Sequence, residues 1–375
     1  MKKICFVLTT ELTAKAFLLN HLLELSKTYD VTVITNTDNP NFLTEVGVNV
    51  KVIPLAIARD ISLFSDFGSL VELIKTFHQE GFSSVHSVTP KAGLLAILAA
   101  WVVRVPLRIH IFTGQVWATK TGFSRSLLKC IDCLIAHLTT SNIVDSPSQR
   151  QFLLSENVIA LTKSIVFSKG SISGVDVDRF KPNDEARVNI RQQFHVGDDE
   201  VLFLFVGRLT RDKGVLDLAE AFSQLPIGDA HLFFVGPDEK SMQDEIMRIA
   251  EKCSKYVHFL GHTNAPESYM ATADVLCLPS YREGFGSVVI EAAAVGIPTI
   301  ASRIYGITDA VVDGETGFLH EPHDVTAIRV CMESMISNKG LRLKFGEQAR
   351  TRAVTDFNSN AITQEWVSFY RKHIH

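Results

Sequence analysis

The sequence predicts an α/β protein with two doubly wound domains, each built around a parallel sheet. Strand patterns and helix patterns alternate along most of the chain, as in parallel sheets that helices cover on both faces. The 375 residues, of which 46% are hydrophobic, can fill two cores. A polar, glycine-broken passage at 170–182 interrupts the alternation once. We therefore expect domains at 1–175 and 176–356, and a C-terminal helix in 357–375 that crosses back to the first domain.

Five short apolar runs in the first half are typical of buried strands. They are KICFVL, VTVITN, VNVKVIPL, SSVHSV and LRIHIF. Helical periodicity between most of these runs covers 14–27, 64–80 and 91–103. A further amphipathic pattern, FSRSLLKCIDCLIAHL, predicts a helix that contains Cys130 and Cys133. Because no second pair stands at zinc-ligand spacing, we expect buried or idle thiols there, not a metal or redox site.

The second half repeats the same alternation. Its strand-like runs are VLFLFVG, HLFFVG, VHFLG, DVLCLPS and PTIAS. Helices are expected at 215–224, 240–252 and 287–295, and after about residue 324 the chain is helical, with a final helix near 362–373. Ligands of such domains bind at the carboxyl ends of the strands. Two domains in tandem would place those ends around one central cleft.

A loop rich in cations follows the first strand of the second half. The segment VLFLFVGRLTRDKG ends its strand at Gly207 and then places Arg208, Arg211 and Lys213 before a helix. Cations at the carboxyl end of a strand, beside a glycine that allows close backbone approach, suit a diphosphate. A solvated, charged loop is the alternative. The spacing fits neither GxGxxG nor the P-loop, so a dinucleotide or ATP site is not indicated.

A second loop carries two glutamates around a glycine-broken turn, in YREGFGSVVIE. The helix after it begins with unpaired backbone amides, which favour a phosphate. Glu291 lies one turn further along the helix, where its carboxylate could accept hydrogen bonds from ribose hydroxyls. Glu283 lies on the loop, nearer the phosphates. A helix start with one solvent-facing glutamate is the alternative, but it explains neither the paired glycines nor the second glutamate.

Together these motifs resemble the retaining glycosyltransferases of the GT4 family, which have the GT-B fold of two Rossmann-like domains facing a central cleft. The resemblance depends on E-x7-E in EGFGSVVIE and on VGRLTRDKG, SGVDVDRFKP, ADVLCLPS and DGETGFLH. It covers nearly the whole second half. The motifs are specific as a group, whereas E-x7-E alone would be weak.

The resemblance implies that the second domain binds a nucleotide-diphosphate sugar, most commonly UDP-linked. Arg208 and Lys213 would hold the diphosphate, and Glu283 would position the sugar and stabilise an oxocarbenium-like state; these three are the expected catalytic residues. Glu291 would bind the ribose. The expected donor-binding residues are Gly207, Gly261, His262, Gly284, Phe285, Gly286, Ser287, Val288 and Glu291.

We expect no cofactor and no catalytic metal, because fixed cations and helix amides can neutralise a leaving diphosphate. The nucleotide-sugar is a substrate. Asp176 and Asp178 form a DxD that could chelate a metal in another transferase fold, but they fall in the domain junction.

The first half matches the family less closely. Many members have a Gly-Gly loop after the first strand, where this chain has TTELTAKAF, so Thr9, Thr10 or Thr13 would contact the donor phosphate instead. Lys91 begins a helix and could meet an acceptor phosphate; a simple surface lysine is the alternative.

A histidine near the acceptor is not fixed by the pattern. Val88 and Thr113, the latter before Gly114, stand where many relatives have histidine. His110 and His86 lie near strand ends, and each could equally be a core residue. We place Thr10, Lys91, His110, Thr113 and Gly114 on the acceptor side.

The segment GQVWATKTGFSRSLLKC combines Trp117 and Phe123 with Lys120, Arg125 and Lys129. Such a mixture suits peripheral contact with the inner membrane leaflet, although an ordinary surface helix would read the same way. The longest apolar run, 92–103, is too short to span a bilayer, and no signal peptide is visible, so we expect a cytoplasmic protein. With a net charge of -4, no nucleic-acid partner is expected.

The leading hypothesis is a retaining glycosyltransferase of polysaccharide or glycolipid assembly, acting on a saccharide or a polyprenyl-diphosphate-linked saccharide. A UDP-sugar 2-epimerase of the same fold and a non-catalytic sugar-nucleotide-binding protein are the alternatives. The chain has no GxGxxG after a strand, which disfavours a dehydrogenase.

Overall fold

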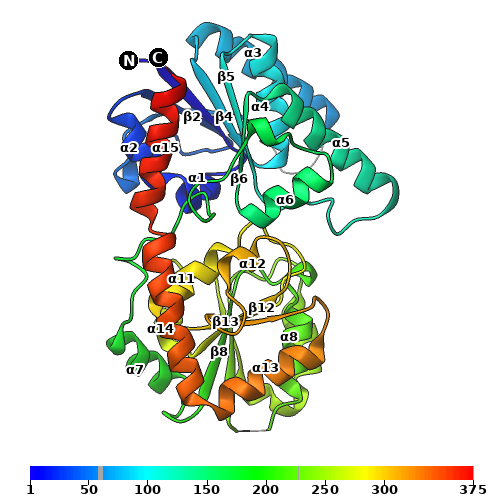
Figure 1. The fold of residues 1–375 in the computed structure, drawn as a ribbon, viewed down its shortest axis with the longest axis vertical. Coiled ribbons are helices and arrows are strands. Elements are labelled where there is room, and N and C mark those ends of the chain that lie inside the picture. The colour runs from blue at the N-terminus through cyan, green and yellow to red at the C-terminus, as the bar shows by residue number, and fades with distance from the viewer. Residues whose placement is uncertain (58–61, 227, 375) are drawn as a thin grey trace. The chain divides into compact units, whose positions relative to one another are not determined.

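The computed structural model describes residues 1–57, 62–226 and 228–374 and divides the chain into two compact units (Figure 1). Unit 1 consists of Met1–Ser173 together with Ser359–His375, and unit 2 of Gly174–Asn358. The C-terminal segment thus belongs to the unit that contains the N-terminus.

Unit 1 is built on a seven-stranded parallel sheet with the order β3-β2-β1-β4-β5-β6-β7. Its strands are β1 (Lys3–Val7), β2 (Asp30–Thr35), β3 (Lys51–Pro54), β4 (Ser84–Val88), β5 (Leu107–Phe112), β6 (Ser141–Val144) and β7 (Ser164–Ile165). The first five were predicted. The short β6 and β7 were missed, because four and two residues carry too little pattern.

The helices of unit 1 are α1 (Glu11–Phe17), α2 (Leu19–Ser26), α3 (Leu63–Glu80), α4 (Pro90–Val102), α5 (Gly122–Leu138), α6 (Pro147–Ser155) and α15 (Ser359–His373). The single helix predicted over 14–27 was wrong. Leu18, with φ −120° and ψ −8°, leaves the helical region, ends α1 and begins α2. Its side chain is fully buried, so packing into the core sets the bend.

Unit 2 is built on a six-stranded parallel sheet with the order β10-β9-β8-β11-β12-β13. Its strands are β8 (Val201–Val206), β9 (Ala230–Val235), β10 (Val257–Gly261), β11 (Val275–Leu278), β12 (Thr299–Ser302) and β13 (Gly317–His320). All but β13 were predicted. The two central strands, β8 and β11, pair directly, so the loops that follow them are neighbours.

The helices of unit 2 are α7 (Asp184–Gln193), α8 (Val215–Ser223), α9 (Met242–Ile249), α10 (Pro266–Thr272), α11 (Ser287–Val295), α12 (Ile307–Ala310), α13 (Val325–Ser337) and α14 (Lys339–Asp356). The bounds of α11 are those that the sequence predicted. The helix predicted over 240–252 ends sooner, and a 3-10 segment, Glu251–Tyr256, takes over.

A stack of four buried rings fastens α15 to the sheet of unit 1. The rings of Phe6 and His86, His86 and Trp366, and Trp366 and His21 lie 4.7–5.0 Å apart, nearly parallel. His86 Nδ1 also lies 2.9 Å from the Tyr370 hydroxyl. His86 is therefore a core residue, one of the two alternatives that the sequence left open, and two of its partners, Trp366 and Tyr370, stand some 280 residues later in the chain.

Among the described helices, none combines the length and the apolar character needed to cross a bilayer. Helix α4, which holds the longest apolar run, is largely buried in unit 1.

Candidate functional site

The two predicted loops of unit 2 meet at the carboxyl ends of β8 and β11. The backbone N–H of Tyr281 donates to the Asp212 carbonyl at 2.9 Å, and Arg282 forms an ion pair with the Asp212 carboxylate at 3.2 Å. Backbone and side chain thus tie loop 207–214 to loop 279–286.

Lys213 and Glu283 form the centre of this site. Lys213 Nζ lies 2.5 Å from Glu283 Oε1, and the Ser280 hydroxyl donates to the same oxygen at 2.8 Å. Their side chains are only 18% and 14% exposed, so water screens this ion pair less than a surface pair. The cation predicted to hold phosphate and the carboxylate predicted to face the sugar are already in contact.

Two glycines allow the backbone of these loops to come close. A Cβ at Gly214, where φ is +69°, would lie 2.1 Å from the Pro279 carbonyl oxygen. A Cβ at Gly306, where φ is +82°, would lie 2.2 Å from the Gly284 carbonyl oxygen. Any other residue at either position would push the loop that carries Glu283 out of place.

The N-terminus of α11 lacks a side-chain cap. Gly286 is the N-cap residue, with φ +78°, and no side chain accepts a hydrogen bond from the first amides, which include those of Ser287 and Val288. Such amides form a site for an anion. The Phe285 ring is buried against Phe357, 5.2 Å between centroids, so Phe285 can offer a ligand only its backbone.

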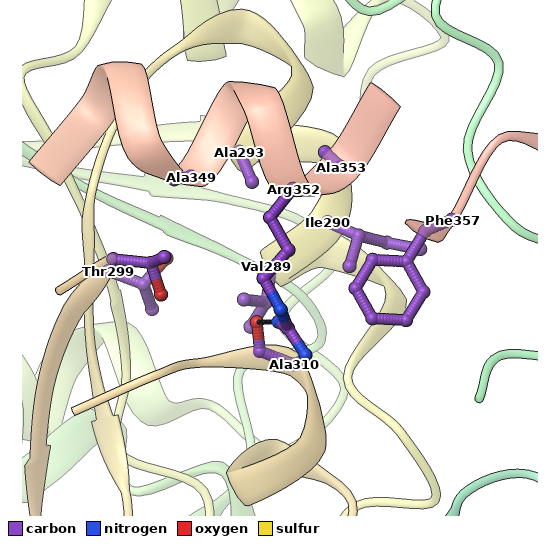
Figure 2. A pocket seen from close by; sticks show the side chains of 10 residues that line it. Val289, Ile290, Ala293, Thr299, Ala310, Ala349, Arg352, Ala353 and Phe357 are labelled. Carbon is purple, nitrogen blue, oxygen red and sulfur yellow. Dashed lines mark hydrogen bonds between the residues drawn. The ribbon is translucent and has the colours of Figure 1, made fainter. Parts of the chain in front are cut away.

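Helix α11 packs on one face and leaves the other open. Figure 2 shows Val289, Ile290 and Ala293 turned toward α14, where Arg352 donates to the Ala310 carbonyl at 2.6 Å. The partly exposed residues of the helix are Ser287, Val288 and Glu291, which share a face at spacings of three and four. Glu291 therefore lies on the same face as the open amides.

The carboxyl group of Glu291 lies in a mostly buried environment. Burial raises the pKa of its carboxyl to about 7, although the charge of Arg179 opposes that rise and Glu267 adds to it. Arg179 is itself paired with Glu267 at 2.8 Å. A carboxylate that lacks a close cation of its own is suited to accept hydrogen bonds from hydroxyl groups of a ligand.

Arg208 does not join the Lys213–Glu283 pair directly. It forms an ion pair with Glu239 at 3.1 Å, in which both side chains are about 40% exposed. Exposed pairs of this kind contribute at most about 1 kcal/mol, so a phosphate can displace Glu239. Arg208 still acts on the site electrostatically, because it is one of the cations that lower the pKa of Asp212.

Burial would raise the pKa of Asp212, but the Thr210 hydroxyl and the charges of Arg282, Lys213 and Arg208 together lower it. Three cations thus surround one carboxylate at the end of β8. This is the local charge that a diphosphate would meet.

The remaining donor-side residues lie at neighbouring strand ends. Gly207 N donates to the Val235 carbonyl at 2.9 Å, and Gly236 N donates to the Gly261 carbonyl at 2.7 Å. Gly261 is the last residue of β10 and His262 follows it, and both are exposed. No described contact joins His262 to Lys213 or Glu283.

A group that the sequence did not single out supports the loop of Glu283. Tyr281 Oη donates to Asp217 Oδ2 at 2.7 Å, and the Tyr281 ring lies 3.8 Å from the ring of His323. Tyr281 and Arg282 stand within the quoted motif and could have been suspected. Asp212, Asp217 and His323 belong to three separate segments, and no spacing connects them.

In unit 1, Thr10 caps the helix that follows β1. Thr10 is the N-cap of α1, where its Oγ1 accepts from Thr13 N at 3.4 Å and lies 3.0 Å from Thr13 Oγ1. Thr9 is buried. Lys91 is only partly exposed and forms an ion pair with Asp66 at 2.6 Å.

His110 lies in a buried hollow at the carboxyl end of β5. Its Nδ1 is 2.9 Å from the Ser87 hydroxyl, and burial lowers the pKa of its imidazole to about 3. Thr113 and Gly114 line the same hollow, as does Asp132 of α5, which the sequence did not single out. The structure therefore brings three of the five acceptor-side residues together.

Trp117 and its cationic neighbours do not form an open surface. The Trp117 indole is buried and donates to Asp132 Oδ2 at 2.7 Å, while Arg125 and Lys129 pair with Glu156 at 2.9 and 2.6 Å. The Trp117 side chain is therefore not available for membrane contact, because it is buried and the indole N–H finds its partner inside the unit.

Some apolar residues of α5 are exposed. Phe123, Leu127, Cys130 and Leu134 follow one another along the helix at spacings of four, three and four and form an exposed row. Cys130 and Cys133 are free thiols.

Within the described residues no group of three His, Cys, Asp or Glu side chains is placed to hold a metal ion. Asp176 accepts hydrogen bonds from the backbone N–H groups of Asp178 and Arg179 at 3.0 and 3.1 Å, so its carboxylate caps a turn.

Comparison with known proteins identifies the family. Residues 186–352 match the family model described as Glycosyl transferases group 1. The capsular polysaccharide biosynthesis glycosyltransferase CapM of Staphylococcus aureus is 32% identical over 323 residues, which cover 85% of this chain and 84% of that protein. The chain belongs to the group 1 glycosyl transferases. The expected family and the expected transferase class are confirmed.

A second relative of the transferase is the Escherichia coli UDP-Gal:alpha-D-GlcNAc-diphosphoundecaprenol alpha-1,3-galactosyltransferase. It is 26% identical over 339 residues, which cover 88% of this chain and 86% of that protein.

Solved structures confirm the GT-B fold of the transferase. Sucrose-phosphate synthase from Thermosynechococcus elongatus has a TM-score of 0.81 at 22% identity, covering 99% of both chains. Anabaena HepE in complex with UDP and glucose has a TM-score of 0.82 at 19% identity, covering 99% of this chain and all of that one. At these identities the likeness establishes the fold alone.

Proposed function

We propose that the transferase is a retaining enzyme that moves a sugar from a UDP-linked donor to a saccharide on a polyprenyl diphosphate carrier, in cell-surface polysaccharide synthesis. The observation that carries this proposal is the partly buried contact between Lys213 and Glu283 beside the open N-terminus of α11. It places a cation, a carboxylate and free amides at one edge of one sheet.

The donor half of the proposal follows from charge. Lys213, Arg208 and the amides of Ser287 and Val288 would bind the diphosphate and neutralise it as it leaves. Glu283 would then exchange its contact with Lys213 for the sugar and stabilise positive charge at the anomeric carbon. Glu291, on the same face of α11 as the amides, would accept the ribose hydroxyls. Gly261 and His262 would lie against the base.

The acceptor half is supported by two relatives. One takes part in capsular polysaccharide biosynthesis, and the name of the other specifies a UDP-galactose donor and a diphosphoundecaprenol-linked acceptor. We propose an acceptor of the same chemistry for unit 1, where Thr10, Lys91, His110, Thr113 and Gly114 would meet it. We further propose that the protein works in the cytoplasm and touches the membrane through the exposed row of α5 when it meets a lipid-linked acceptor.

The experiment that tests this function pairs donors with acceptors. Purified protein is incubated with UDP-, GDP- and dTDP-sugars and with polyprenyl diphosphates that carry N-acetylglucosamine, N-acetylgalactosamine, glucose or galactose. We expect nucleoside diphosphate release from a UDP-sugar, and a product whose anomeric proton coupling matches that of the donor. Activity should survive a chelator, because the proposed site neutralises charge with side chains and amides.

An inverted product would contradict the retaining assignment. Conversion of the free sugar nucleotide to its 2-epimer would establish the epimerase alternative. Tight donor binding without release, with every acceptor in the panel, would favour the non-catalytic binding protein.

A further inference from the structure

We propose that Asp132 binds a hydroxyl group of the acceptor in the hollow at the carboxyl end of β5, as a residue that selects the acceptor sugar. The inference rests on the proposed function, and it names a subsite in unit 1 that no motif of the sequence indicates.

The first argument is that one carboxylate oxygen of Asp132 has no hydrogen-bond partner among the described residues. Its side chain comes from the middle of α5 and is 6% exposed. Oδ2 accepts the hydrogen bond from Trp117 Nε1 at 2.7 Å, whereas Oδ1 receives none from the described residues. Oδ1 is not among the buried, unpaired side-chain atoms of the described residues, so solvent reaches it. A ligand hydroxyl could therefore replace water at this oxygen.

The second argument is that there is room for such a donor. The hollow that Asp132 lines has a volume of about 10 Å³, which is room for one water or one hydroxyl group. Thr113 and Gly114 line it as well and are partly exposed, so it reaches the surface of the unit. It lies where β5 ends, and ligands of parallel sheets bind at strand ends.

The third argument concerns the shape of the hollow. His110, which lines it, lies flat against α4, where a Cβ at Gly93 would stand 2.4 Å from the ring carbon Cε1. Gly93 is thus the residue that gives His110 its position. The low pKa of His110 keeps that ring neutral, so it adds no cation that would compete for the Asp132 carboxylate.

The chemistry of the ligand follows from these contacts. An ionised carboxylate accepts hydrogen bonds, and burial raises the pKa of Asp132 only to about 6, so the group is mainly ionised at neutral pH. A sugar hydroxyl is a donor of the right size, whereas a phosphate would be repelled. The hollow thus suits the saccharide part of the acceptor, not its diphosphate.

The test uses Asp132→Asn with a set of acceptors that each lack one hydroxyl. Asparagine keeps the volume and an oxygen for Trp117, but it turns an N–H toward the hollow. We expect kcat/KM for the best acceptor of the panel to fall about 10- to 100-fold, the usual effect of losing a hydrogen bond to a charged group. UDP affinity and acceptor-independent UDP release should not change.

One deoxy acceptor should be poor with the wild type and no worse than its parent with Asp132→Asn. Trp117→Phe, which removes the indole donor and part of the buried ring but keeps the Asp132 carboxylate, serves as the control and should preserve this discrimination. If the hollow holds only a bound water, every deoxy acceptor will respond equally in both proteins, which overturns the proposal. Wild-type protein that transfers no sugar overturns the proposed function and this inference with it; normal transfer by Asp132→Asn overturns the inference alone.

Discussion

Lys213 Nζ lies 2.5 Å from Glu283 Oε1, and the Ser280 hydroxyl donates to the same carboxylate oxygen. The cation and the carboxylate come from loops some 70 residues apart, and they meet because β8 and β11 are neighbours. Each group partly neutralises the other. In the proposed function, a donor diphosphate would draw Lys213 away from Glu283, and this exchange would leave Glu283 to act on the sugar.

Replacing Glu283 with glutamine should separate binding from catalysis. Without the carboxylate, Lys213 is free, so UDP should bind as tightly as to the wild type or more tightly. Transfer should fall about 100- to 1,000-fold, as when one preorganised electrostatic group is removed. Calorimetry and initial rates measure the two effects, and Ser280→Ala, which keeps the charge, should show much smaller changes. Weaker UDP binding in Glu283→Gln would show that the carboxylate mainly binds the donor.

Glu291 should make donor binding depend on pH. Since the pKa of its carboxyl is raised to about 7, the group is protonated below that pH and cannot accept two ribose hydrogen bonds. Affinity for a UDP-sugar should rise by up to about tenfold for each pH unit gained below 7, and Glu291→Gln should flatten this profile. An unchanged profile in Glu291→Gln would assign the titration to another group.

The same carboxyl should limit stability. Its folded pKa of about 7 exceeds the unfolded value of 4.5, so the folded protein binds the proton more tightly and loses stability as pH rises through 7. We expect Glu291→Gln to raise the melting temperature of the donor-free protein at alkaline pH and to have little effect at about pH 5. The matched control is Glu321→Gln, at a strongly exposed carboxyl just after β13. It should leave the melting temperature unchanged at both pH values.

The buried histidines should make unit 1 sensitive to acid. Burial lowers the pKa of His21 to about 4 and of His110 to about 3, and it also lowers that of His86. All three stay neutral in the fold, but the unfolded chain takes up protons below about 6.5, so stability falls as pH drops through that value. Each of the three histidines lowers the free energy of unfolding by about 1.4 kcal/mol for each pH unit below that value.

Tryptophan fluorescence measures this loss in unit 1 alone, because the chain has three tryptophans and Trp101, Trp117 and Trp366 all lie there. The urea concentration at the midpoint of unfolding should be lower at about pH 5.5 than at about pH 7.5. His137→Gln, an exposed site on α5, should leave the shift intact. Equal unfolding curves at both pH values would mean that the histidines are hydrated.

The exposed row of α5 should bind anionic vesicles. Phe123 is 82% exposed and Leu127 48%, and exposed Lys120 precedes them. Serine at Phe123 and Leu127 together should reduce co-sedimentation with phosphatidylglycerol vesicles several-fold, because two apolar side chains no longer enter the interface. Leu343→Ser, equally exposed on α14 of unit 2, should have no effect. Equal loss in both variants would contradict a specific membrane face.

The sequence could predict that the candidate donor-side residues lie close together, because they stand in two continuous segments. Loop 279–286 and helix α11 carry Glu283, the glycines and Glu291 within a dozen residues, and the alternation of strands places the cationic loop at the same sheet edge. What the sequence could not give is the pairing inside the site. Arg208 pairs with Glu239, and Lys213 pairs with Glu283. Which cation meets which carboxylate depends on how the side chains are placed in the folded structure.

The acceptor side could be predicted less well for a physical reason. Lys91, His86 and Trp117 look alike as polar or amphipathic residues near strand ends, yet each has a partner on another element or segment: Asp66, Tyr370 and Asp132. Such partners are known only once the helices are packed. Asp132 was missed for the same reason, since one acid in an amphipathic helix reads as a surface residue.

The central claim is that the diphosphate of the donor binds unit 2 at Lys213, Arg208 and the N-terminus of α11. The most direct measurement is the affinity for UDP of Lys213→Ala and Arg208→Ala against Arg211→Ala, a cation of the same loop that is 67% exposed and paired with Glu245. We predict a loss of at least about tenfold for the first two, as expected for a charge-assisted contact, and almost none for the third. Equal affinities in all three would contradict the account.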